Sequence, residues 1–388
     1  MTTRTRLLVL LATALAASFV AVADLLRMLV PGFLGGLPVS LLGRLGPGVE
    51  LAVAVTAALV ALAVAGVAAA AELGARRAAP GMPVAPPASR AAPRAVRAAA
   101  LTAAALLAAA TPGDVIPLAG YSFSLTVLIG IVVFIVLTVL RRPRLGILLA
   151  VIVGAVSVYA VVAHDADALF PRLLSVYGAA LTEAGLSLAH VAAAAGLLAW
   201  SLVSAASAAV PAGGVAAFVL RHRVAITIVA ALCALPYVVA RASWLTPWPA
   251  FGGAAEVFDA DPSVRVLGLL LGLGMLTGGV LTLGLVLPWG ERFPRILAGV
   301  GGHPVPVGLA VIPASVVSVL FTAAGVGFAI EAAGPGKDTV QLLLIFPFWL
   351  WGPMLALAAW GYAMHRAVVA GRAGEGRAPV AGPRVVGG

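Results

Sequence analysis

The sequence predicts an all-α polytopic transmembrane helix bundle of about ten spans, with both termini in the cytoplasm. Three observations lead to this prediction. Of the 388 residues, 62% are hydrophobic and only 10% are charged, whereas soluble domains carry roughly 25% charged residues. The apolar residues form long stretches, most of them near the ~20 residues with which a helix crosses a bilayer. Finally, the arginines gather on alternate connections between these stretches, as expected of a multi-pass membrane protein.

The apolar stretches are too long for barrel strands and lack their alternation of polar and apolar residues. In chain order, the expected spans cover residues 7–23, 51–71, 98–115, 122–140, 145–162, 181–210, 224–240, 264–287, 305–330 and 340–369. The stretch 98–115 is the weakest because it is rich in alanine. We retain it, because an odd number of spans would place the arginine-rich C-terminal tail outside.

Positive charge defines the expected orientation. The inner segments hold the arginine groups near residues 4–6, 76–97, 141–144, 221–223 and 292–295, and those of the tail from Arg366 onwards. The outer segments hold only Arg27, Arg44, Arg172, Arg241, Arg265 and Lys337. Most acidic residues lie outside, which supports the same orientation.

The chain reads as a single membrane domain over residues 1–371, followed by a disordered cytoplasmic tail at 372–388. Residues 72–97 are rich in Pro, Ala and Arg and form a predicted cytoplasmic linker. The first span has a second interpretation. Arg4 and Arg6, an apolar run and then Ala21-Val22-Ala23 are also typical of a cleavable signal peptide. Ten spans would also accommodate two inverted five-helix halves.

The net charge of +10 does not indicate a nucleic-acid partner, because the basic residues follow the topology and form no stripe among aromatic residues. The bias of arginine over lysine, with abundant Ala, Gly and Val, is typical of a high-GC bacterium, so we expect the bacterial plasma membrane. The single cysteine, Cys233, allows no intrachain disulfide. The sequence predicts no catalytic, cofactor-binding or metal-ligating residues and no cofactor.

A few polar and aromatic residues are candidates for a substrate site or cavity: Glu183, His190, Tyr237, Trp244, Trp248 and Trp351. Glu183 and His190 share one helical face but are separated by about 10 Å of rise, so they cannot bond directly. Ionisable groups at membrane depth usually face the bundle interior, and a histidine titrates near neutral pH, so a proton relay is one interpretation. Anchoring of helix ends at the interface is the alternative for the tryptophans.

Other residues are candidates for anchoring and packing. Trp289, Arg292 and Arg295 on an inner turn can contact lipid headgroups, with a gate or partner contact as the alternative. Gly268, Gly272, Gly274 and Gly278 form small-xxx-small pairs that permit close helix approach. Asp24 and Arg27, three residues apart, can pair on one helical face.

Several motifs together resemble a group of uncharacterised actinobacterial multi-pass integral membrane proteins. They are Trp244-Leu-Thr-Pro-Trp-Pro, Leu281-Thr-Leu-Gly284, Trp289-Gly-Glu-Arg-Phe-Pro-Arg295 and Ile312-Pro313-Ala314. The resemblance is strongest over residues 241–314. It implies a location in the membrane and no activity.

Two function classes follow. The first is a transporter or permease for a small or amphiphilic substrate. The second is a non-transporting module that binds lipid or a protein partner, and an integral membrane enzyme ranks third. Membrane lipids are expected partners, together with a small-molecule substrate and either a second copy of the chain or another membrane protein.

Overall fold

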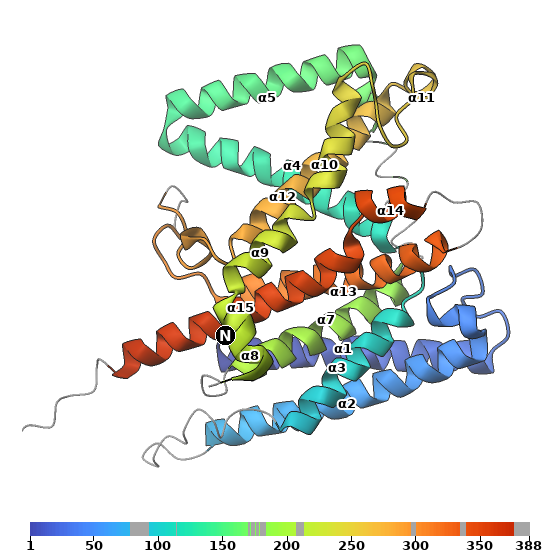
Figure 1. The fold of residues 1–388 in the computed structure, drawn as a ribbon, viewed down its shortest axis with the longest axis vertical. Coiled ribbons are helices and arrows are strands. Elements are labelled where there is room, and N and C mark those ends of the chain that lie inside the picture. Colours follow the sequence, from blue (N-terminus) through green and yellow to red (C-terminus); the bar gives the residue numbers. More distant parts are fainter. Residues whose placement is uncertain are drawn as a thin grey trace, which may run out of the picture.

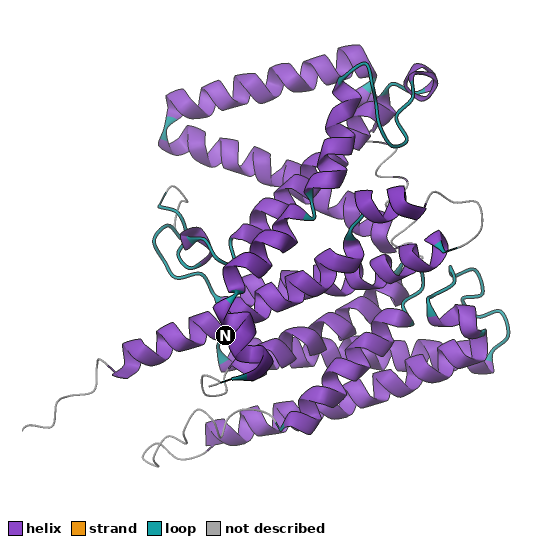
Figure 2. Cartoon of the chain, in the orientation of Figure 1, coloured by secondary structure: helices purple, strands orange, loops and turns teal. Residues whose placement is uncertain are grey.

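A computed structural model describes residues 1–77, 93–113, 115–169, 184–206, 213–295, 300–333 and 339–375, with isolated positions between 171 and 178. Over these residues the chain forms helices joined by turns and loops, with no β-strand (Figure 2). Nine described segments are helical, long and apolar enough to cross a membrane. The chain is therefore an all-α, multi-pass membrane protein, as the sequence predicts.

The helices follow the expected spans closely. They are α1 (Thr3–Leu29), α2 (Pro47–Arg77), α3 (Arg94–Ala109), α4 (Val115–Arg141), α5 (Pro143–His164), α7 (Gly185–Ala206), α8 (Gly214–Arg221), α9 (Arg223–Leu232), α10 (Leu235–Ala242), α11 (Ala255–Ala260), α12 (Ser263–Leu283), α13 (Val307–Ala332), α14 (Thr339–Ile345) and α15 (Phe348–Glu375). Short 3-10 turns η1 (Leu42–Leu45), η3 (Ala166–Ala168), η4 (Ser243–Leu245) and η5 (Pro288–Gly290) lie in the connections.

Helix α3 corresponds to the weak third span. It has 16 residues and is therefore about 24 Å long, shorter than the ~30 Å hydrocarbon core of a bilayer. Its alanines explain how it fits, because Ala100, Ala103 and Leu107 are buried against α2 and α7. It ends at Ala109, earlier than the sequence predicts.

The arginine-rich ends of the helices gather on one side of the bundle. In Figure 1 the start of α1, the end of α2, the α4–α5 turn, the α8–α9 junction and the end of α15 all lie toward the left. The α1–α2 and α3–α4 connections and the segment around α11 lie toward the right. The chain thus alternates between two ends, as the charge pattern requires.

The core consists of two clusters joined by α7. One cluster packs α1, α2 and α3 against α7, and the other packs α9, α13 and α15 against it. In the most apolar part of α7, 72% of the residues are buried, whereas in the corresponding part of α5 only 6% are buried. Helices α4 and α5 form a hairpin that projects from the bundle (Figure 1).

Glycines set the closest helix approaches. A Cβ at Gly196 of α7 would overlap the hydroxyl of Thr13 on α1, and one at Gly352 of α15 would overlap the hydroxyl of Thr322 on α13. At the α4–α5 turn, a Cβ at Gly146 would overlap the backbone of Val139. Such close backbone approach is typical of membrane helix pairs.

The helices reach further into the predicted linker than expected. Helix α2 continues to Arg77 and α3 begins at Arg94, so both ends of the segment 72–97 are helical, while residues 78–92 lie outside the described part. Arg6 pairs with Glu72 across 3.0 Å, which ties the start of α1 to the end of α2. Helix α15 extends to Glu375, and the rest of the expected tail also lies outside the described residues.

Candidate functional site

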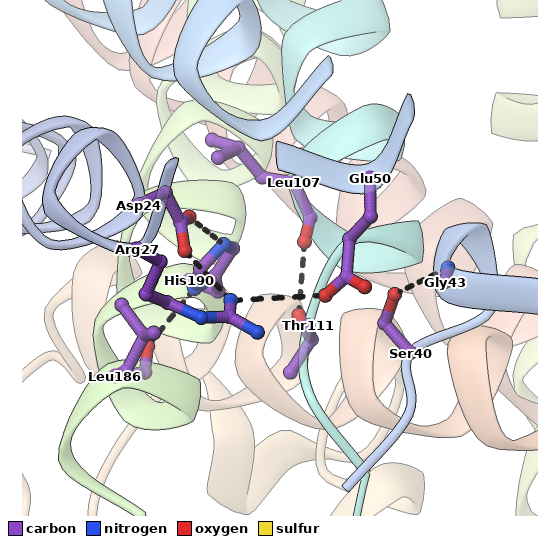
Figure 3. Close-up of polar contacts among 9 residues, drawn as sticks. All are labelled: Asp24, Arg27, Ser40, Gly43, Glu50, Leu107, Thr111, Leu186 and His190. Carbon is purple, nitrogen blue, oxygen red and sulfur yellow. Dashed lines mark hydrogen bonds and ion pairs between the residues drawn. The ribbon is translucent and has the colours of Figure 1, made fainter. Parts of the chain in front are cut away.

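A buried polar network links three helices near the right-hand ends of these helices in Figure 1. It joins Asp24 and Arg27 of α1, Glu50 of α2 and His190 of α7 (Figure 3). The side chains of Asp24 and His190 are 0% exposed. The predicted Asp24–Arg27 pair is confirmed, with Arg27 Nη1 lying 2.9 Å from Asp24 Oδ1.

The His190 ring contacts a backbone carbonyl on one side and Asp24 on the other. His190 Nδ1 lies 3.0 Å from the carbonyl oxygen of Leu186, and because a carbonyl only accepts, Nδ1 donates this bond. Nε2 faces Asp24 Oδ2 at 3.2 Å, an ion-pair distance without hydrogen-bond alignment.

Arg27 connects this pair to a second carboxylate. Its Nη1 lies 3.8 Å from Glu50 Oε1, and Glu50 sits in the first turn of α2, after Pro47. Gly43 lies directly opposite it, because a Cβ at this position would lie 2.6 Å from Glu50 Oε2. The loop containing η1 therefore closes directly over the Glu50 carboxylate.

The network combines two acidic side chains, Asp24 and Glu50, with the guanidinium of Arg27 and the imidazole of His190. Beside the network lies Thr111, just after α3, whose hydroxyl donates to the Leu107 carbonyl at 2.9 Å. Arg44 of η1 pairs with Glu331 of α13 at 3.4 Å. The described residues include no group of three or more His, Cys, Asp or Glu arranged to hold a metal ion.

Two spans are interrupted by proline, and the interruptions meet. The break between α9 and α10 precedes Pro236, and the break between α14 and α15 contains Pro347. Proline cannot donate the backbone hydrogen bond that a helix requires. At the second break, the indole of Trp349 donates instead to the Leu343 carbonyl at 3.3 Å. The rings of Tyr237 and Phe346, one beside each break, lie 5.1 Å apart.

An aromatic cluster continues on both sides of this contact. Phe346 contacts Phe251 at 5.6 Å and Phe328 at 5.5 Å between ring centroids. Phe348 stacks on Phe321 at 4.2 Å, and Phe321 contacts Trp351 at 4.8 Å. The two broken spans and α13 are therefore joined by rings, and the Ser318 hydroxyl of α13 also donates to the Gly352 carbonyl of α15 at 2.7 Å.

The turn around η5 is held against α15 by hydrogen bonds and an ion pair. Tyr362 donates to the Gly290 carbonyl at 2.8 Å, and Arg366 donates to the Val305 carbonyl at 2.9 Å. Glu291 lies 3.1 Å from His365 Nε2, so its partner is on a distant helix rather than in the turn. This set of contacts was not anticipated from the sequence, because residues 362–366 lie in an otherwise ordinary apolar span.

The structure brings some of the candidate residues together and separates others. His190 belongs to the polar network. Tyr237 and Trp351 belong to the aromatic cluster and are 5% and 2% exposed. Trp244 is buried and donates to the Ala250 carbonyl at 2.7 Å, whereas Trp248 is 82% exposed. Glu183 lies outside the described residues.

The inner-turn and glycine candidates also occupy distinct places. Trp289 folds back over Gly284, where a Cβ would overlap its ring, and both Arg292 and Arg295 are exposed. On α12, Gly268 and Gly272 face Trp244 and Arg241, whereas Gly274 and Gly278 face Ser124 and Phe123 of α4. The two glycine pairs therefore pack on different neighbours.

The sequence singled out Asp24 and His190 but did not connect them, and it missed Glu50. One general rule could have indicated the link. Ionisable groups within a membrane are costly, so His190 is expected to pair with a polar group on another span. Pro47 at the expected start of a helix also places Glu50 in the first turn of α2 rather than in a loop.

Searches of protein-family models, curated proteins and solved structures find no match to this chain. The class of protein is therefore defined by the fold itself. It is a multi-pass integral membrane protein with a buried polar network and two proline-broken spans.

Proposed function

We propose that the protein is a proton-responsive permease for a small or amphiphilic substrate in a bacterial plasma membrane. The observation that carries the proposal is the buried network of Asp24, Arg27, Glu50 and His190. Ionisable groups in membrane spans are costly and commonly mark proton or substrate pathways. His190 connects α7 to Asp24 of α1 within this network.

The two broken spans support the same proposal. Discontinuous helices are common in secondary transporters, where they form substrate sites near the middle of the membrane. Here the breaks before Pro236 and at Pro347 meet at the Tyr237–Phe346 contact. Loss or gain of one proton in the network would change the electrostatic attraction among α1, α2 and α7, and α7 packs against α15 of the second broken span.

The test combines a deletion strain with three complementing variants. Metabolite and lipid profiling of the strain should show a compound that changes in abundance, and the wild-type gene should restore the normal profile. Asp24→Asn and His190→Gln should fail to restore it at normal protein levels. His222→Gln is the matched control, because His222 makes the same ring-to-carbonyl contact at 2.9 Å but is exposed, and no carboxylate of the described residues pairs with it.

Full restoration by both Asp24→Asn and His190→Gln, or an unchanged profile in the deletion strain, would argue against the proposal. Thermal unfolding of each purified variant separates a lost function from a lost fold. A variant that unfolds at the wild-type temperature and fails to complement supports a functional role of the network.

A second candidate function is a membrane module that binds a protein partner. It is favoured by the α4–α5 hairpin. In the most apolar parts of these two helices, only 11% and 6% of the residues are buried. A partner would cover part of this surface. Co-purification of a second membrane protein, lost when Val151 and Val158 of α5 are replaced by bulky tryptophans, would support this alternative.

A further inference from the structure

Arg241, near the outer end of α10, is held by aromatic rings rather than by acids. Its guanidinium carbon lies 4.1 Å from the ring centroid of Trp244, 4.8 Å from that of Tyr237 and 6.0 Å from that of Phe251. Trp244 is fixed by its hydrogen bond to Ala250. Cation–π contacts of this kind orient a guanidinium without neutralising its charge.

The donors of Arg241 are largely unused. Nη1 reaches only the Phe251 carbonyl, at 3.4 Å, and Nε is buried without a hydrogen-bond partner among the described residues. No carboxylate among the described residues pairs with Arg241. By contrast, Arg6, Arg27 and Arg44 each pair with an acid. An arginine presents a planar fork suited to carboxylate and phosphate groups.

The position of Arg241 is fixed by α12. Its Cβ lies 3.0 Å from where a Cβ on Gly272 would be, and the Trp244 ring covers Gly268. The guanidinium is therefore part of a rigid arrangement and not a mobile surface side chain. A second guanidinium, that of Arg265, lies 4.4 Å from the Phe258 ring, and Phe258 contacts Trp244 at 5.2 Å.

A run of partly exposed rings leads away from Arg241. Phe251 contacts Phe346, and Phe346 contacts Phe328. These three rings are neither fully buried nor fully exposed, so they present an apolar surface beside a cation. That combination matches a molecule with an acid group at one end and an apolar chain behind it.

We propose that Arg241 binds the acid group of an anionic amphiphile, whose apolar chain lies along Phe251, Phe346 and Phe328. This names the substrate class of the proposed permease and in that respect rests on the proposed function, although binding itself can be tested without transport. The same chemistry has two sources, a free carboxylate amphiphile and an anionic phospholipid.

The test uses the full chain in phosphatidylcholine nanodiscs with radiolabelled dodecanoate as the probe. The wild type should bind it saturably. Arg241→Gln should weaken binding by about tenfold to a hundredfold, the loss expected for one charge-assisted hydrogen-bonded contact. Arg44→Gln is the matched control, because Arg44 also lies outside and is already paired with Glu331. Arg241→Lys, which keeps the charge but not the planar fork, should show an intermediate loss.

A second arm identifies the source. Nanodiscs containing phosphatidylglycerol are examined by native mass spectrometry for lipid that stays on the protein. Lipid retained by the wild type and lost in Arg241→Gln supports the phospholipid, whereas dodecanoate binding without retained lipid supports the free amphiphile. Equal binding of both probes by the wild type and Arg241→Gln would overturn the proposal. Arg241-dependent binding with full complementation by His190→Gln and Asp24→Asn would instead overturn only the proposed function.

Discussion

At the scale of single residues, Asp24 is the centre of the polar network. It contacts Arg27 on one side and His190 on the other, and it is fully buried. A buried ion pair contributes little net stability, but removing one partner leaves an uncompensated charge. Removal of Asp24 would therefore be costly because it would leave Arg27 and His190 without this carboxyl group.

We expect Asp24→Ala to destabilise the protein by about 3–5 kcal/mol. Arg27 would lose its nearest carboxylate, and His190 would lose the carboxyl group that it faces. Unfolding of the purified protein in detergent measures this effect. Asp167→Ala is the control, since Asp167 is exposed in η3 and should change stability by no more than about 0.5 kcal/mol. Equal effects of the two substitutions would contradict the role given to Asp24.

Residue types and the pairing within one helix could be predicted from the sequence, but partners on other helices could not. His190 was recognised as an ionisable group in a span, and Asp24 and Arg27 as a pair. The link between His190 and Asp24 depends on how α1 and α7 are rotated about their axes. This rotation is set by contacts such as Gly196 against Thr13, which pair residues far apart in the chain.

At the scale of helices, the α4–α5 hairpin depends on a tight turn. A Cβ at Gly146 would overlap the Val139 backbone, whereas Gly154, further along α5, has open space around it. The two glycines lie on the same apolar helix and thus form a matched pair.

We expect Gly146→Ala to destabilise the hairpin by about 1–3 kcal/mol, because overpacking forces backbone shifts. Gly154→Ala should be neutral or stabilise by up to about 1 kcal/mol, since alanine favours a helix over glycine. Limited proteolysis of the α4–α5 turn and thermal unfolding report the difference. Equal behaviour of the two variants would show that the turn tolerates a side chain at Gly146.

We expect the mature protein to retain α1. Leu10, Ala17 and Val20 are almost fully buried in the core, and cleavage after Ala23 would remove them all. N-terminal sequencing of the purified protein checks this expectation. A mature chain beginning at Asp24 would instead favour the signal-peptide interpretation of the first span.

At the scale of the whole molecule, spacing and charge were enough to predict the spans and their alternation. The breaks in the spans at residues 224–240 and 340–369 lie beside Pro236 and Pro347. Pro313 and Pro353 lie inside continuous helices, so a proline alone does not locate a break. Composition could not predict that the two breaks meet, because the Tyr237–Phe346 contact depends on the packing of the complete bundle. The projecting position of α4 and α5 was likewise inaccessible, since their sequences are as apolar as those of buried spans.

The orientation can be checked with engineered cysteines. Cys233 is the single native cysteine, so Cys233→Ala gives a background without thiols. We expect Trp248→Cys to react with a membrane-impermeant maleimide in intact cells, because Trp248 is 82% exposed and is assigned to the outside. Arg142→Cys and Arg292→Cys should react only after permeabilisation. The opposite pattern would invert the topology.

The central position of α7 has a consequence for biogenesis. This helix has the lowest mean hydropathy of the nine candidate spans, and the largest share of its residues is buried. Its buried residues include Ser187, Ser201 and Ser204. Such a segment partitions from the translocon into lipid less readily than its neighbours. Its insertion would be helped by α1, α2 and α3, which are synthesised first and offer it a protein surface instead of lipid. The order of synthesis thus matches the order in which these helices can pack.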